Sequence, residues 1–284
     1  MAAAPSRQTR KRVRLDIAAI ALAPLGLLLI LYAQQLEGVP VSALLQLPAA
    51  LIVFGGTLGA VLVSHSLAEV GKGIGAAAQT FTAVEDDSET LSATILSLAI
   101  RAHRRGMAAV ESELDTITEP FLKEGLTLVV DDTPLDMLRE NLKAATELQQ
   151  LEDESPARIF DAAAGYSPTL GILGAVLGLI RVMQNLAAPG ALGGGIAVAF
   201  VATIYGVGFA NLVLLPLAAR LRERAALDAR RREMMIHGIC AIQQRLHPRL
   251  VTQKLRPFSS KVPRIEDVVA RMARTAPQGA KVPA

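Results

Sequence analysis

The chain has 284 residues, of which 51% are hydrophobic and 19% charged, and its formal net charge is +3. This composition is typical of a membrane protein with a modest polar part. The single cysteine, Cys240, excludes a disulfide framework or a cysteine metal site within one chain. A nucleic-acid partner is not expected either, because the basic residues flank apolar runs and no aromatic side chains accompany them.

Two apolar runs near the N-terminus predict two membrane helices. Residues 1–14 are rich in Arg and Lys and precede an uncharged run over residues 17–35. That run is longer than the apolar core of a signal peptide and lacks a good cleavage site, so we predict an uncleaved first span. Residues 41–65 are free of charge and predict the second span. We therefore expect a basic cytoplasmic N-terminus over 1–14 and transmembrane helices 1 and 2 within 15–66.

The most apolar part of the chain, residues 166–219, predicts a transmembrane hairpin. Its single formal charge is Arg181, and the Gly-rich stretch 189–195 divides it into two apolar runs. Each run has about 20 residues, which at about 1.5 Å per residue spans the hydrocarbon core of a bilayer. These runs are the predicted third and fourth spans.

Small residues line one face of each helix of this hairpin at helical spacing. They are Pro168, Gly171, Ala175 and Gly178 on the first helix, and Ala199, Thr203, Gly206 and Ala210 on the second. Such faces let another helix approach closely, which drives association inside a membrane. The approaching helix can belong to another subunit or be the other helix of the same hairpin, and the residues leave both alternatives open.

The distribution of basic residues predicts the topology. The short connections 34–40 and 187–195 contain no Lys or Arg, whereas the N-terminus and the segment after Ala219 are rich in both. By the positive-inside rule both termini are cytoplasmic. The expected fold is an all-α membrane protein with four transmembrane helices and a helical cytoplasmic insertion, residues 67–165, between helices 2 and 3.

Helix start and stop signals divide the polar parts of the chain. Ser88 to Gly106 reads as one helix, and the pairs Thr133-Pro134 and Ser155-Pro156 each predict a further helix start. After the fourth span, residues 220–248 predict a basic cytoplasmic helix ended by Pro248. Residues 249–284 are predicted to be a flexible tail, mostly disordered from Pro257 onward.

A basic cluster followed by an acidic cluster surrounds Gly106. The basic residues are Arg101, Arg104 and Arg105, and the acidic residues include Glu111 and Glu113. Taken alone, these residues predict a solvated helix pair with local salt bridges, each contributing little to stability.

The ionisable residues of the predicted spans, His65 and Arg181, lie near helix ends. No Asp, Glu, Lys or His lies in the middle of a predicted span. A proton pathway through hydrocarbon usually needs such a group, so a conducting complex requires a second polypeptide that supplies a carboxylate. The four histidines are scattered and no nucleophile and base pattern occurs. We therefore expect no enzyme, no metal and no cofactor.

The hairpin also carries a resemblance to a known family. The strings GYSPTLGILGAVLGLIRVMQNLA and GGGIAVAFVATIYGVGFANLVLLPLA resemble the third and fourth segments of flagellar stator A subunits, the MotA/PomA family, and more distantly the ExbB/TolQ proton channels. Weaker similarity covers most of residues 15–250. The resemblance implies a homopentamer in the bacterial inner membrane around a dimer of B subunits. Each B subunit would supply a transmembrane Asp and a peptidoglycan-binding domain, and proton flow would drive torque on the rotor.

The resemblance also implies roles for residues of the hairpin. Pro168 and Pro216 match the two prolines of the family, with Pro168 as a hinge; a simple structural kink is the alternative. Sodium-type relatives place Thr where this chain has Ala175, which leaves Thr203 as the one hydroxyl beside the expected path. We therefore predict H⁺ rather than Na⁺ as the ion. A Thr203 hydroxyl bonded to its own helix is the alternative for that residue.

In the charged segment the resemblance implies contact with the switch-complex protein of the rotor. Glu111 matches the acidic residue of the family and Arg104 one of its basic residues, whereas His103 stands where the family usually has Arg. Two rival functions remain at this point. One is an ExbB/TolQ-type energiser of an outer-membrane system, which would have three spans. The other is a membrane scaffold or solute permease without ion flux.

Overall fold

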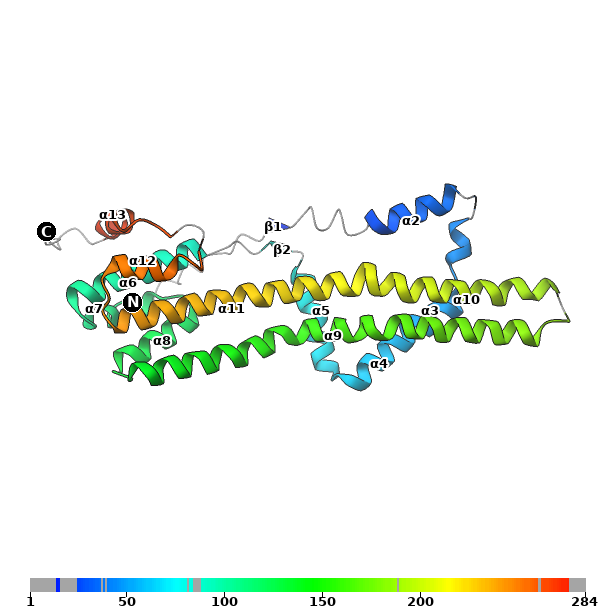
Figure 1. Ribbon diagram of the computed structural model, residues 1–284, viewed down its shortest axis with the longest axis horizontal. Helices are drawn as coiled ribbons and strands as arrows, with labels where there is room; N and C mark the ends of the chain where they lie inside the picture. The colour runs from blue at the N-terminus through cyan, green and yellow to red at the C-terminus, as the bar shows by residue number, and fades with distance from the viewer. Residues whose placement is uncertain are drawn as a thin grey trace, which may run out of the picture. The chain divides into compact units, whose positions relative to one another are not determined.

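The protein is almost entirely helical (Figure 1). The computed structural model describes residues 14–15, 25–36, 38, 40–80, 82–83, 88–187, 189–259 and 262–275. The helices are α2 (Leu25–Leu36), α3 (Leu47–Ala50), α4 (Gly56–Ser64), α5 (Leu67–Thr80), α6 (Ser88–Arg105), α7 (Ala108–Glu111), α8 (Pro120–Val130), α9 (Leu135–Gln184), α10 (Pro189–Phe209), α11 (Leu215–Gln243), α12 (Pro248–Leu255) and α13 (Ile265–Thr275).

Short irregular segments complete the secondary structure. Turns of 3-10 helix lie at Val41–Leu44 and Leu114–Thr116, and π-helical segments lie at Leu51–Gly55 and Ala210–Leu214. The strands β1 (Arg14–Leu15) and β2 (Thr82–Ala83) form a two-residue antiparallel pair. The π segments join α3 to α4 and α10 to α11 without a break in the helix.

The chain divides into two compact units. Unit 1 comprises residues 1–85 and 152–224, and unit 2 comprises residues 86–151 and 225–284. The long helices α9 and α11 contribute residues to both units.

Three helical stretches among the described residues are long and apolar enough to cross a membrane. They are Leu47–Ser64, Leu135–Gln184 and Leu192–Gln243, and they cover most of the second, third and fourth predicted spans. Of the first predicted span, α2 covers residues 25–36, while residues 17–24 lie outside the described residues. The count of four spans therefore stays a prediction.

Unit 2 has a core of large aliphatic side chains from α6, α7, α8, α9, α11, α12 and α13. Its fully buried members are Ile95, Leu96, Val110, Leu122, Leu126, Leu138, Met234, Met235, Ile239, Ile242 and Leu255. The predicted helix from Ser88 to Gly106 is confirmed: α6 ends at Arg105, and Gly106 follows with a φ of +80°, the left-handed conformation that terminates helices.

The predicted helix start at Ser155-Pro156 is wrong. Helix α9 begins at Leu135, next to the correctly predicted Thr133-Pro134 start, and continues without interruption to Gln184 with Pro156 and Pro168 inside it. A proline removes one backbone hydrogen bond from a helix. When packing holds the helix on both sides of the proline, the helix bends there but need not end. The predicted boundary between residues 165 and 166 accordingly falls inside α9.

The C-terminal region also differs from its prediction. Helix α11 ends at Gln243, before Pro248, which instead occupies the first turn of α12. Within the predicted disordered tail, Ile265–Thr275 form α13, and its Val268 is only 3% exposed in the unit 2 core. Disorder was predicted because Pro, Ser, Lys and Arg are scattered through the tail and aromatic residues are few. The apolar residues of α13 nevertheless share one face, which packs against the core.

Candidate functional site

The small-residue faces of α9 and α10 pack against each other. A Cβ atom added at Gly171 would lie 2.9 Å from the carbonyl oxygen of Ala202, and one at Gly206 would lie 2.7 Å from that of Ser167. A Cβ atom at Gly178 would lie 2.8 Å from the amide nitrogen of Ala199. Of the two alternatives left open by the sequence, the structure thus shows contact within the hairpin.

A buried serine at this interface was missed by the sequence analysis. Ser167 is fully buried, and its hydroxyl donates a hydrogen bond to the carbonyl oxygen of Gly206 at 3.0 Å. Hydrogen bonds between membrane helices add on average about 0.6 kcal/mol. The available signal was a polar residue next to Pro168 in an apolar segment. Ser167 therefore fixes the register of the hairpin beside the proposed hinge.

The structure brings Pro168 and Thr203 to the same part of the hairpin. A Cβ at Gly206 would lie 3.2 Å from the Cα of Pro168, and one at Gly171 would lie 3.4 Å from the Cα of Thr203. Both Pro168 and Thr203 are half-buried. The Thr203 hydroxyl donates to the carbonyl oxygen of Ala199 at 3.3 Å, so it is bonded to its own helix but keeps lone pairs that can accept.

The two other predicted pathway residues lie farther along the helices. Ala175 is half-buried and follows Pro168 by about 10 Å of helix rise, at about 1.5 Å per residue. Pro216 is exposed and lies about 20 Å of helix rise beyond Thr203. Pro216 is the second residue of α11 and follows Leu215, which directly succeeds the π-helical segment Ala210–Leu214. The four residues therefore do not form one compact site.

Aromatic residues attach the second span to α10. The Tyr205 hydroxyl donates a hydrogen bond to the carbonyl oxygen of Leu44, and its ring stacks on Phe54 with ring centroids 5.5 Å apart. Phe54 also meets the edge of Phe209 at 5.0 Å. Sequence analysis did not single out these residues, although a tyrosine within an apolar span is a signal, because its hydroxyl requires a partner.

The charged residues around Gly106 fall into two groups in the structure, those in an ion pair and those that are exposed. Arg101 and Glu113 form an ion pair with each other, and their side chains are 26% and 31% exposed. Arg104, Arg105 and Glu111 are exposed. The local salt bridge predicted from the residues alone thus accounts for Arg101 and Glu113, whereas the other three are accessible to a partner. Contact with the rotor stays a prediction for all five.

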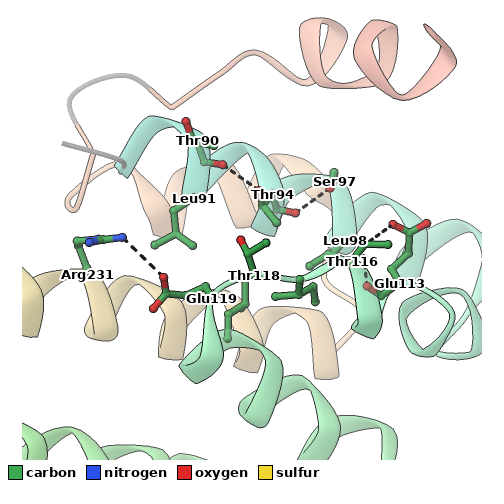
Figure 2. A pocket seen from close by; sticks show the side chains of 12 residues that line it. Thr90, Leu91, Thr94, Ser97, Leu98, Glu113, Thr116, Thr118, Glu119 and Arg231 are labelled. Carbon is green, nitrogen blue, oxygen red and sulfur yellow. Dashed lines mark hydrogen bonds and ion pairs between the residues drawn. The ribbon is translucent and has the colours of Figure 1, made fainter. Parts of the chain in front are cut away.

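A cavity of about 150 Å³ in unit 2 has Glu113 in its lining. Figure 2 shows the side chains that line it. Its polar lining residues are Thr90, Thr94, Ser97, Glu113, Thr116, Thr118, Glu119 and Arg231. Of the charged lining residues, Arg231 lies 3.9 Å from Glu119, and Glu113 is paired with Arg101, which lies outside the lining. The cavity is lined mainly by hydroxyls and ion pairs, and we assign it no chemistry.

The fold and the hairpin define a class of protein. It is a helical membrane protein in which two spans close on each other through glycine contacts and expose large apolar side chains. The part of the chain that the structure describes contains no group of three His, Cys, Asp or Glu residues that could hold a metal ion. This class is that of a membrane channel or scaffold subunit.

Comparison with known proteins gives the family. Residues 113–234 match the model of the MotA/TolQ/ExbB proton channel family. The chain is 31% identical to the uncharacterized protein YtxD of Bacillus subtilis (strain 168) over 217 residues, covering 76% of this chain and 80% of YtxD. It is also 31% identical to Motility protein A of the same organism over 225 residues, covering 78% of this chain and 82% of that protein. The chain belongs to the MotA/TolQ/ExbB proton channel family.

A solved structure supports the same assignment. The chain is similar to a chain of the flagellar MotAB stator complex from Bacillus subtilis, with a TM-score of 0.76 and 29% identity. The similarity covers 92% of this chain and 99% of the other. The predicted resemblance to stator A subunits is confirmed.

Proposed function

We propose that this chain is the A-type subunit of a flagellar motor stator, which conducts protons together with a B-type partner and converts the flow into torque. The observation that carries the proposal is the likeness to the stator chain over almost its whole length, in a fold whose hairpin matches that family by sequence. In this proposal residues 67–165 and both termini are cytoplasmic, and four spans cross the bacterial inner membrane.

The hairpin explains why a partner is required. Between residues 166 and 219 the chain has one formal charge, Arg181, which follows the proposed path residues Pro168 and Ala175 toward the far end of α9. A carboxylate from a transmembrane helix of the partner would take up each proton beside Thr203. Each proton that crosses releases about 2.3 kcal/mol per 100 mV of membrane potential.

Coupling to the rotor would use the continuity of α9. Protonation removes the charge of the partner carboxylate and lets a ring of A subunits, which we propose to be a pentamer, step around the partner. Pro168 removes one backbone hydrogen bond from α9 and provides a place for bending. Helix α9 then continues from Pro168 back to Leu135, about 50 Å at about 1.5 Å per residue. A bend at Pro168 can therefore move residues far from the hairpin.

The ion is proposed to be H⁺. Sodium needs several oxygen ligands, and Ala175 supplies none, whereas Thr203 has a single hydroxyl that already donates to Ala199. A carboxylate that takes up a proton needs no such shell. No resident cofactor or metal is part of the proposal.

The test is rotation of tethered cells in which this chain and its candidate B-type partner replace the native stators. Proton uncoupler and sodium are titrated separately. We expect rotation to stop with the uncoupler at every sodium concentration. Rotation that demands sodium and ignores the uncoupler would contradict the choice of ion. Membrane insertion and assembly with the partner but no rotation would favour an ExbB/TolQ-type energiser instead.

A further inference from the structure

The C-terminal end of α6 meets a second basic segment that is distant in sequence. This segment, residues 244–249, consists of the connection between α11 and α12 and the first two residues of α12. We call it the α11–α12 turn. The ring nitrogen Nδ1 of His103 donates a hydrogen bond to the carbonyl oxygen of Arg245 at 3.0 Å, and the rings of His103 and His247 meet edge to face with centroids 5.3 Å apart. Helix α12 packs alongside α6 (Figure 1).

The backbone of the α11–α12 turn is well defined. The amide of Leu246 donates to the carbonyl of Ala241 at 3.1 Å and that of Arg245 to Ile242 at 2.9 Å, which is the Schellman pattern at a helix end. Arg245 has a φ of +48°, at the position where this pattern usually has glycine. A side chain in this conformation costs about 1 kcal/mol. Arginine is thus present where the backbone favours glycine.

Four exposed arginines adjoin these contacts in the sequence: Arg104 and Arg105 follow His103 at the end of α6, and Arg245 and Arg249 lie in the turn. Among the described residues, no guanidinium group of the four forms an ion pair or hydrogen bond. Arg101, by contrast, is paired with Glu113. Unpaired charges of one sign repel one another, and such a cluster attracts an oppositely charged partner.

The helix dipoles explain three of these four arginines but not the fourth. Arg245 follows the C-terminal end of α11, where a positive charge is favourable. Arg104 and Arg105 lie in the last turn of α6, where a positive charge is favourable. Arg249 lies in the first turn of α12, where a positive charge is unfavourable, and that turn contains no acidic residue. The dipole effect therefore gives no structural reason for Arg249, and the turn geometry gives none for Arg245.

We propose that the α11–α12 turn is the second half of the rotor-facing surface, in which Arg104, Arg105, Arg245 and Arg249 together bind an acidic surface of the rotor protein. His103 is a positioning residue that holds the turn against α6. This inference rests on the proposed function and adds residues about 140 positions away from the charged segment.

The key variant is Arg245→Gly. It removes the guanidinium group while placing glycine where the Schellman pattern prefers it, so the fold should be as stable as the wild type or more stable. We expect the purified complex of this chain with its B-type partner to bind the rotor switch-complex protein about three- to tenfold more weakly, with a shallower salt dependence. Arg249→Gln should act in the same way, and the double variant should lose most torque at high load.

A matched control is Arg256→Gln. Arg256 is also exposed and follows the other end of α12, about 10 Å of helix rise from Arg249. That distance exceeds the Debye length of about 8 Å at physiological salt, so its charge contributes little at the turn. Arg256→Gln should bind and rotate like the wild type.

The role of His103 is tested by a conservative exchange. His103→Ala removes the donor to the Arg245 carbonyl and should weaken rotor binding, whereas His103→Asn keeps a donor in a similar place and should restore it. Two variants with equal binding would show that the bond does not position the turn.

The outcomes separate this inference from the proposed function. If the wild-type chain rotates cells while Arg245→Gly/Arg249→Gln binds and rotates equally well, the inference is overturned and the proposed function stands. If the double variant and Arg256→Gln lose binding equally, the effect is one of total charge and the inference is also overturned. A wild-type chain that neither rotates cells nor binds the rotor protein would overturn both.

Discussion

The hairpin of unit 1 and the core of unit 2 bury opposite kinds of side chain. In the hairpin, contact is made by Gly171, Gly178 and Gly206, while Ile172 and Phe200 are 60% and 70% exposed. In unit 2, large aliphatic and methionine side chains are fully buried. Water drives large apolar groups inward by about 25 cal/mol per Å², whereas lipid is as apolar as they are. The difference shows which solvent each region is built for.

The comparison is tested most strongly at the hairpin. Gly206→Ile places a side chain 2.7 Å from the Ser167 carbonyl and 3.0 Å from the Cα of Gly171, and backbone atoms cannot move aside as side chains do. We expect the free energy of unfolding in mixed detergent to fall by about 3 kcal/mol, at the upper end for overpacking. The matched control is Gly208→Ile on the same helix, where an added Cβ meets nothing within 4 Å. Equal stability of the two variants would contradict the close-packed hairpin.

In unit 2 a side chain added at a buried glycine would clash with another side chain, and a second substitution can relieve this clash. An alanine Cβ at Gly125 would lie 2.4 Å from the Cδ1 atom of Ile239. Gly125→Ala should lower the free energy of unfolding by about 1–2 kcal/mol. Ile239→Val removes the conflicting methyl group, so the double variant should be more stable than the sum of the two single changes predicts. Additive changes in chemical denaturation would show that the two positions do not touch.

A smaller effect distinguishes paired from unpaired charges in unit 2. Arg101→Gln or Glu113→Gln breaks a partly exposed ion pair and should lower the free energy of unfolding by about 0.5–1 kcal/mol. Arg104→Gln should change it by less than about 0.5 kcal/mol but reduce rotation. The reversal Arg101→Glu/Glu113→Arg should restore stability. If Arg104→Gln were the more destabilising change, the assignment of Arg101 and Glu113 as a structural pair would be wrong.

The smallest effect is a pH dependence confined to unit 2. Burial lowers the pKa of His237, with Lys254, Arg139 and Lys143 adding to the shift and Glu233 opposing it. The unfolded chain therefore takes up the proton first as pH falls below about 6.5, and the folded state loses stability until the lower folded pKa is passed. His237→Gln should flatten the acid limb of thermal unfolding. A steeper acid limb in the variant would reverse the sign of this argument.

Much of the fold follows from local sequence signals. Apolar stretches of about 20 residues predict the second, third and fourth apolar helices, Gly106 marks a helix end, and Thr133-Pro134 marks a helix start. The local signals gave a wrong helix start at Pro156, because the sequence around a proline does not show the packing that allows α9 to continue through it. The local signals also missed α13, because this helix depends on the packing of its apolar face, which includes Val268, against a core formed by other segments.

The candidate site was predictable to a similar extent. The resemblance implied roles for Pro168, Thr203, Arg104 and Glu111, because the strings that carry it lie within a few helical turns, and these roles stay predictions. Ser167 and the junction of His103 with Arg245 were missed. The role of Ser167 depends on a carbonyl oxygen 39 residues away in the sequence, and that of His103 on one 142 residues away. No local pattern encodes such a partner.

The sequence by itself determined the class of protein, the apolar hairpin and the absence of Asp, Glu, Lys and His from the middle of its helices, since these are properties of composition along short stretches. Only the tertiary structure decided that the glycine faces pack against each other, that Arg101 and Glu113 form an ion pair, and that the α11–α12 turn contacts α6. The physical reason is that each of these contacts fixes two distant segments at once. A free backbone carbonyl, a glycine face or a guanidinium group becomes specific only when the fold brings its partner near.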